Sequence, residues 1–456
     1  MADVVLFNPK FQEILKAGGI YYTCPPLDLC YIASALEQEN FSVSIYDSNI
    51  EPGQCIADYV KSEKSRLLGI TASSLALPAA YKALGEIHKN SEVEVVLVGQ
   101  HVTEDPGILK EFGLRYGFRG YCEHGFTDLC KFLVKDVGDL SKIDGLVRNE
   151  NGRITENKKK PSDFGSLAIP ARHLLDLSKY KYISISASRG CPYSCSYCRS
   201  TGPFYIHASE YELRKPGDVV EEMKGVVAKY GPVLFDFVDD VFTYDKGWVR
   251  DFCSLVRNEF PKIAWTCSTR PDLLSDETVL ELRNSGCFQV CIGVESGSEV
   301  VRKGISREMS DSVIRKAFRA CGKAGLRARA SAMIGLPGED KDDFENTIEL
   351  LKELKPTYVF LYPAILLPGS GLYELALHEG LIQEGVWARY MRGEIPLLIY
   401  LPKGIKREEI SNYLRDGYRR FYLNPSYMFQ RLSRARSISD VKEYLGFMLR
   451  YVQETG

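Results

Sequence analysis

Two successive series of strand-like and helix-like segments constrain the fold of this 456-residue chain more than any other feature. In the first series, short apolar runs that end in turn residues alternate with segments whose apolar residues recur at helical spacing. Apolar strands separated by amphipathic helices form a parallel sheet covered on both faces. The series therefore predicts an α/β domain with a doubly wound parallel sheet over residues 1–142. Its predicted strands are 3–9, 41–49, 67–74, 94–101 and 116–120.

The second series begins near residue 181, after a hairpin and linker predicted over 143–180. Asn151-Gly152 between short alternating runs is the hairpin signal. Six further strand–helix units predict an open or partial barrel over 181–395, with its chemistry at the carboxyl ends of the strands. A helical C-terminal region is predicted over 396–456. The predicted barrel strands are 182–188, 233–240, 263–269, 287–294, 326–335 and 356–366, and the predicted C-terminal helices are 407–423 and 439–453.

Composition narrows the class of protein. The formal net charge of −2 gives no overall basic field, so we expect no general nucleic-acid binding. No uninterrupted apolar run is long enough for a transmembrane segment. Thirteen cysteines without a secretory leader favour a reducing, cytoplasmic setting with reduced or metal-bound thiols. Most are expected to be inert core residues, including Cys287 and Cys291, whose side chains should share one face of an apolar strand.

Three cysteines directly follow the first strand of the second series. The segment RGCPYSCSYC (189–198) has the spacing C-x3-C-x2-C, so three thiolates can wrap one metal centre. A 4Fe–4S cluster takes one thiolate per iron, and three ligands leave one iron open to a chelating molecule. The alternative is a zinc loop, but structural zinc needs four ligands, usually in two separated pairs, and no second pair occurs here. The pattern favours a 4Fe–4S cluster on Cys191, Cys195 and Cys198.

With Tyr197 before its last cysteine, this motif resembles the C-x3-C-x-aromatic-C motif of the radical S-adenosylmethionine (SAM) superfamily. The resemblance implies a TIM-type partial barrel in which the open iron binds SAM and reductive cleavage gives a 5′-deoxyadenosyl radical. The segments FDFVDDVF, WTCSTRPDLL, GVESGSE, MIGLPGE and LLPGSGLY resemble the family's later strand ends, in order. Each segment also has an ordinary interpretation, as a helix cap, a surface carboxylate or a turn. The implied SAM contacts are Tyr197, Asp239, Arg270, Glu295, Ser296, Gly335 and Pro337.

The first domain resembles the cobalamin-binding, flavodoxin- or Rossmann-like domain that precedes the barrel in one radical SAM subgroup. The resemblance rests on Asn8-Pro9 and residues 25–49, 68–74, 97–106 and 118–125. The signature D-x-H-x-x-G of other cobalamin domains is absent, as is usual in this subgroup, and a purely structural domain is the alternative. The implied cobalamin contacts are Asn8, Pro26, Ser73, Ser74, Leu75, Gly99, Gln100, His101, Gly120 and Glu123.

Together with YRRFYLNPSYM (418–428), these resemblances cover almost the whole chain. They imply a methyltransferase of the class B radical SAM type, which moves a methyl group from SAM through methylcobalamin to an unactivated carbon. The alternatives are a cobalamin-dependent cyclase or rearrangement enzyme, and a noncatalytic cobalamin- or SAM-binding regulator. The expected partners are a flavodoxin- or ferredoxin-like electron donor and a substrate between the domains: a small molecule, a lipid or a protein side chain. The C-terminal segment 427–453 is expected to cover the barrel rather than to dock a protein or a membrane.

Overall fold

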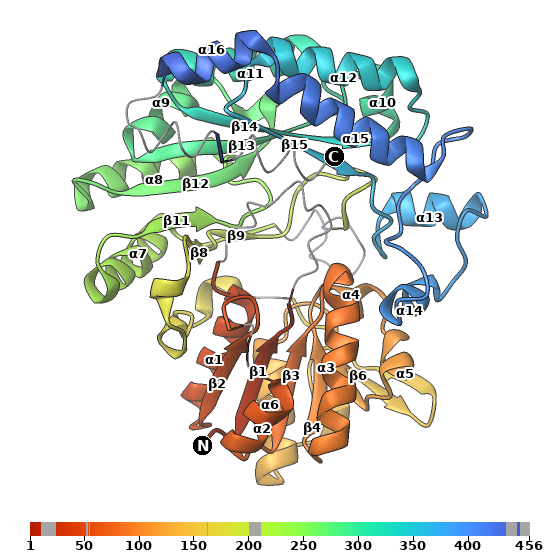
Figure 1. The fold of residues 1–456 in the computed structure, drawn as a ribbon. Helices are drawn as coiled ribbons and strands as arrows, with labels where there is room; N and C mark the ends of the chain where they lie inside the picture. Colours follow the sequence, from red (N-terminus) through yellow and green to blue (C-terminus); the bar gives the residue numbers. More distant parts are fainter. Residues whose placement is uncertain are drawn as a thin grey trace.

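The computed structural model describes residues 1–10, 24–51, 53, 55–161, 163–199, 211–434 and 445–446. Figure 1 shows two α/β halves, with the first below the sheet of the second and helices α9, α11 and α12 above that sheet. The elements of the first half begin with β1 (Val4–Asn8), α1 (Leu27–Gln38), β2 (Val43–Asp47), α2 (Ile56–Glu63), β3 (Leu67–Thr71), α3 (Leu77–Asn90) and β4 (Glu94–Val98). They continue with α4 (Gln100–Glu104), α5 (Ile108–Phe112), β5 (Tyr116–Phe118) and α6 (Glu123–Lys135).

The first five strands are parallel and lie in the order β2-β1-β3-β4-β5. This order confirms the predicted flavodoxin-like, doubly wound sheet, and its switch point lies between β1 and β3. Successive residues of β1 point to opposite faces of the sheet and so enter two different hydrophobic cores. Val4 and Leu6 pack toward α1 and α6, while Val5 and Phe7 pack toward α2 and α3. The switch point places the ends of β1 and β3 where a ligand of this fold binds.

The predicted hairpin is present, but it belongs to the first sheet. Strands β6 (Leu146–Glu150) and β7 (Arg153–Glu156) add to β5 in antiparallel register. Their turn uses Asn151 at φ 53° and Gly152 at φ 87°, the two positive angles that the tightest hairpin turn requires. The sheet therefore reaches residue 156, whereas the first domain was predicted to end at 142.

The second half is an open barrel of six parallel strands in the order β8-β11-β12-β13-β14-β15. Each of the six predicted strands is present, which confirms the partial barrel. The strands are β8 (Ile183–Ile185), β11 (Leu234–Phe237), β12 (Ala264–Thr269), β13 (Cys287–Glu295), β14 (Arg327–Ile334) and β15 (Tyr358–Pro363). A two-stranded ribbon, β9 (Ser188–Arg189) with β10 (Glu212–Leu213), lies beyond β8.

Helices cover the outside of the barrel, and several begin at capping side chains. Asp245, Ser275 and Asp340 each accept a hydrogen bond from a backbone N–H in the first turn of the helix that follows. The helices of the second half are α7 (Pro216–Tyr230), α8 (Lys246–Glu259), α9 (Asp276–Asn284), α10 (Glu299–Gly304), α11 (Asp311–Ala324), α12 (Lys341–Leu354), α13 (Gly371–His378) and α14 (Val386–Met391), the last of which packs against α3 of the first half. Within the described residues, none of the helices is long and apolar enough to cross a membrane.

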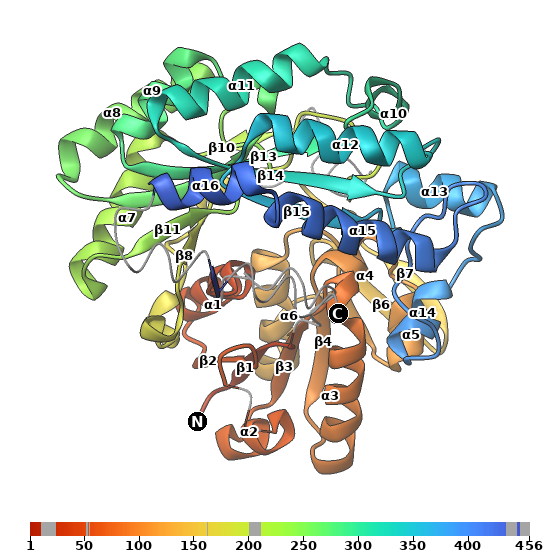
Figure 2. The same cartoon turned by 45° about the horizontal axis from the view of Figure 1, so that its top comes forward.

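The C-terminal helices α15 (Arg407–Tyr422) and α16 (Pro425–Arg434) protect the last barrel strand. Figure 2 shows α15 beside β15. The Tyr422 hydroxyl accepts a hydrogen bond from the Val359 N–H and donates one to the Val359 carbonyl. Tyr418 does the same at Leu361. The unpaired edge of the open barrel is thereby satisfied, as edge strands require. The predicted helix 407–423 is confirmed, whereas most of 439–453 lies outside the described residues.

Candidate active site

The three-cysteine loop leaves β9 through Gly190, whose φ of 80° turns the chain. Two barrel segments then hold the middle of the loop. The Ser196 N–H donates to the Ile305 carbonyl at 3.1 Å, and the Ser196 carbonyl accepts from the Leu372 N–H at 2.7 Å. The loop is therefore fixed at the carboxyl ends of the barrel strands, where this architecture carries its chemistry.

Cys191, Cys195 and Cys198 line one cavity of about 200 Å³. All thirteen cysteines lie in the described part of the chain, and none forms a disulfide. Burial raises the pKa of the Cys191 thiol to about 12, with smaller contributions from Asp240 and the other two cysteines. Thiols in such a place become thiolates when a metal binds, because the metal compensates their charge.

This donor set fits an iron–sulfur cluster. Among the described residues, no three His, Cys, Asp or Glu side chains converge as ligands of a single ion. A 4Fe–4S cluster binds one thiolate per iron, so its ligands surround it rather than meet at a point. Three thiols on a loop that is held at its centre provide this arrangement and leave one iron open.

Cys291 also lines this cavity, which corrects the expectation that it shares a face with Cys287. A bulge in β13 explains the difference. Trp265 pairs with Cys287, but the next residue, Thr266, pairs with Gln289. The extra residue reverses the alternation. Cys287 is consequently buried in the core, while Cys291 faces the cavity.

Three of the expected SAM contacts, Tyr197, Arg270 and Glu295, line the same cavity. Glu295 has a φ of 66°, unusual for a residue other than glycine. The cavity also holds Arg307, which the sequence did not single out. The Arg307 guanidinium donates to the Tyr197 hydroxyl at 3.2 Å and the Gly293 carbonyl at 2.8 Å. Arg307 lies beyond α10, and no local pattern marks it.

The other four expected SAM contacts do not line this cavity. Asp239 accepts hydrogen bonds from the backbone N–H groups of Ala187 and Ser188, and burial raises its pKa to about 6. Ser296 accepts from the Ser298 N–H. Gly335 and Pro337 form a turn in which the buried Glu339 carboxylate accepts from two backbone N–H groups. In this structure all four stabilise strand ends and turns around the site.

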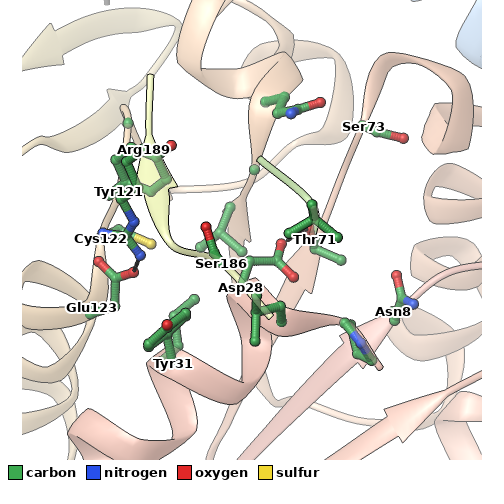
Figure 3. Close-up of a pocket in the computed structure, with 18 of the residues that line it drawn as sticks. Asn8, Asp28, Tyr31, Thr71, Ser73, Tyr121, Cys122, Glu123, Ser186 and Arg189 are labelled. Atoms are coloured by element: carbon green, nitrogen blue, oxygen red, sulfur yellow. Dashed lines mark hydrogen bonds and ion pairs between the residues drawn. The ribbon is translucent and has the colours of Figure 1, made fainter. Parts of the chain in front are cut away.

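A second cavity, of about 470 Å³, lies between the two halves at the carboxyl ends of β1, β3 and β4 (Figure 3). It occupies the switch point of the first sheet, and its volume is typical of a cofactor site. Gly99, at φ 104°, packs so closely that a Cβ there would lie 3.0 Å from Thr71 Oγ1. The expected cobalamin contacts that line it are Asn8, Pro26, Ser73, Gly99, Gln100, Gly120 and Glu123.

Ser74, Leu75 and His101 do not line this cavity. His101 is fully buried; its Nδ1 lies 2.9 Å from Ser74 Oγ, and its ring packs against Trp387. Burial lowers the pKa of His101. Because α4 begins at Gln100, the next side chain turns away from the cavity into the core between α4 and α14.

Arg189 and Asp28 are lining residues that sequence reasoning missed. The Arg189 guanidinium pairs with the Glu123 carboxylate, and its Cζ lies 3.8 Å from the Tyr121 ring centre. Asp28 Oδ2 accepts from Thr71 Oγ1 at 3.1 Å, and burial raises the pKa of this carboxyl group. In Figure 3, Asp28 and Arg189 face the cavity from opposite halves of the molecule. Its wall therefore combines close backbone, aromatic rings and polar groups, which suits a large polar-edged cofactor.

Comparison with known proteins finds one matching family model for each half of the chain. Residues 185–351 match the model of the radical SAM superfamily, and residues 17–130 match that of the B12-binding domain. An uncharacterised methyltransferase of Pyrococcus horikoshii is 31% identical over 99% of this chain and 96% of its own length.

Two further proteins are similar to this chain over most of its length. An anaerobic magnesium-protoporphyrin IX monomethyl ester cyclase of Rubrivivax gelatinosus is 23% identical over 93% of this chain and 78% of its own length. The structure of the radical SAM methyltransferase TsrM of Kitasatospora setae, with cobalamin and a 4Fe–4S cluster, superposes with a TM-score of 0.76. That match covers 99% of this chain and 100% of TsrM at 17% identity, so it demonstrates a shared fold.

Proposed function

Because this chain belongs to the family of radical SAM enzymes that carry a cobalamin-binding domain, we propose that it transfers a methyl group from SAM, by way of cobalamin, to an unactivated carbon. The observation that carries the proposal is that the two cavities adjoin each other. Asp240 lines both of them, and Gly190 on one side is followed by Cys191 on the other. A radical generator and a methyl carrier would then act on one substrate between the halves.

The cofactors of the chain are a 4Fe–4S cluster, SAM and cobalamin. When bound, the cluster and SAM supply a 5′-deoxyadenosyl radical, and cobalamin supplies a transferable methyl group. Cys191, Cys195 and Cys198 would hold the cluster. Arg307 and Glu295 offer a cation and an anion to the amino-acid part and the ribose of SAM.

Residues of the first half would hold cobalamin at the switch point. Gly99 and Gly120 let the backbone approach it, since both have positive φ angles and no side chain. Asp28 and Glu123 are carboxyl groups on the wall, and they can accept hydrogen bonds from amide groups of the ligand.

The setting is proposed to be a reducing compartment, the cytoplasm, with a flavodoxin- or ferredoxin-like electron donor. Two points support this setting. None of the thirteen cysteines forms a disulfide, and the cluster must receive an electron before it can cleave SAM. The substrate is a small molecule, a lipid or a protein side chain that reaches the space between the halves.

Anaerobic reconstitution with iron, sulfide, cobalamin and SAM carrying a deuterated methyl group tests this function. We expect about four irons per chain, 5′-deoxyadenosine under reducing conditions, and label on cobalamin by mass spectrometry. Cys198→Ala should lose the iron and the 5′-deoxyadenosine, whereas Cys55→Ala, in the first half, should retain both.

Two outcomes would contradict the proposal in different ways. A wild-type chain that takes up zinc or no metal would remove the radical chemistry altogether. A loaded enzyme that cleaves SAM but never labels cobalamin or any substrate would exclude methyl transfer. It would favour the cyclase or rearrangement alternative, which the 23% identical cyclase makes the second candidate.

A further inference from the structure

Two arginines converge on one of the three cluster cysteines. Arg270 Nη1 lies 3.8 Å from Cys195 Sγ, and Arg307 Nη1 lies 3.7 Å from the same sulfur. Both arginines are 6% exposed. They come from different parts of the barrel, Arg270 from the end of β12 and Arg307 from the loop after α10.

Each arginine is held by an aromatic residue of the cysteine loop and by a carboxylate outside it. Arg270 lies over the Tyr193 ring at 3.8 Å and binds both carboxylate oxygens of Asp272 at 3.0 Å. Arg307 donates to Tyr197 and lies 3.4 Å from a Glu295 oxygen. Tyr193 and Tyr197 are the residues two before and two after Cys195, so each guanidinium is held by a neighbour of the sulfur that it approaches.

We infer that Arg270 and Arg307 raise the reduction potential of the cluster through the Cys195 sulfur, independently of SAM. Hydrogen bonds to cluster sulfurs and nearby charge are established determinants of such potentials. Reduction adds one negative charge to the cluster, and a fixed positive charge in a buried site favours the more negative state. The arginines are therefore positioning residues that make the first electron transfer more favourable.

Asp272 and Glu295 make the inference directional. Each carboxylate pairs with one guanidinium and offsets its charge, so removing an arginine also leaves an uncompensated anion near the cluster. Substituting an arginine should lower the potential, and neutralising its carboxylate should raise it. A purely structural role would change cluster content but would not give shifts of opposite sign.

Gly293 offers a perturbation of the whole Arg307–Glu295 pair. A Cβ built at Gly293 would lie closest to Glu295 Oε1 and 2.7 Å from Arg307 Nη2, so an alanine displaces both side chains without changing their charges. Gly293→Ala therefore moves two opposite charges at once and gives no shift of fixed sign, whereas the Arg307 and Glu295 substitutions change one charge each.

Redox titration of the reconstituted protein without SAM, followed by electron paramagnetic resonance, tests the inference. The inference rests on the proposed function only in that the cluster binds, and iron content reports this separately. At a fixed potential, Arg307→Gln and Arg270→Gln should each lower the ratio of reduced to oxidised cluster about tenfold, which is a shift of about 59 mV for one electron. Arg307→Lys should recover part of the loss.

Glu295→Gln should shift the midpoint upward, and Arg315→Gln, the same charge change on the outer face of α11, should leave it unchanged. Unchanged midpoints in loaded arginine variants would overturn the inference; so would shifts that occur only with SAM present, since these would assign the arginines to SAM binding. If neither glutamine variant takes up iron, Asp272→Asn and Glu295→Gln decide, and a midpoint equal to wild type in both would refute the inference.

Discussion

Removing the Tyr422 hydroxyl should weaken the last strand of the barrel by a predictable amount. This hydroxyl is the partner of both the N–H and the carbonyl of Val359, at 2.9 and 3.0 Å, and the side chain is fully buried. Tyr422→Phe retains the ring and leaves two buried backbone groups without their partner. Each such group costs about 1–3 kcal/mol, so for the two groups we expect a loss of about 2–6 kcal/mol.

The geometry explains why two tyrosines four residues apart serve this strand. Four residues of helix rise about 6 Å, and two residues of strand span about 6.6 Å. The spacing of Tyr418 and Tyr422 therefore matches that of Leu361 and Val359, which lie two residues apart and direct their backbone groups to the edge of the sheet. The double variant Tyr418→Phe/Tyr422→Phe should lose more stability than either single variant.

Amide hydrogen exchange is the assay, because it measures local opening in a chain with two halves. At the lower limit of 2 kcal/mol, the Val359 amide should exchange about 30-fold faster in Tyr422→Phe. Tyr413→Phe is the matched control, since Tyr413 lies on the same helix and packs its ring on Phe344. Equal exchange in the Tyr422 and Tyr413 variants would refute the reasoning.

Three further predictions concern residues in and around the two cavities. Burial raises the pKa of Glu339 to about 7, so the stability that its protonated form contributes is complete below about pH 4.5 and is lost as the pH rises through 7. In Glu339→Gln the thermal unfolding midpoint should depend less on pH over that range. A pH dependence equal to that of the wild type would contradict this. Arg189→Gln leaves the buried Glu123 carboxylate unpaired and should destabilise the chain by about 3–5 kcal/mol and reduce cobalamin retention, measured by calorimetry and absorbance. His101→Asn should retain bound cobalamin with an unchanged spectrum, because the ring faces Trp387; loss of the cofactor would place His101 in the site after all.

Much of the fold follows from local patterns in the sequence. Strand alternation and helical periodicity located the parallel strands, and each predicted barrel strand overlaps an observed one. The cysteine loop was predictable for the same reason, since its three thiols lie within eight residues of one another. The tyrosines of YRRFYLNPSYM were noticed as a resemblance, and the structure gives the physical reason for two of them.

What the sequence could not provide depends on contacts between distant residues. Arg307 reaches Cys195 across 112 positions, and Arg189 reaches Glu123 across 66. The bulge in β13 has no local signature, yet because of it Cys291 faces the cavity lined by the three-cysteine loop. The expectation for His101 assumed a side chain directed at the ligand, whereas the start of α4 turns it into the core.

The backbone from Ser188 to Cys191 connects the two cavities. Asp239 holds Ser188, the first half holds the Arg189 side chain through Glu123 and Tyr121, and Cys191 is two residues further along. Because Gly190 alone separates Arg189 from Cys191, we expect a change in how the first half holds Arg189 to move the first cysteine of the loop. We therefore expect Arg189→Gln, which breaks the buried Arg189–Glu123 pair, to change the spacing between the two cavities.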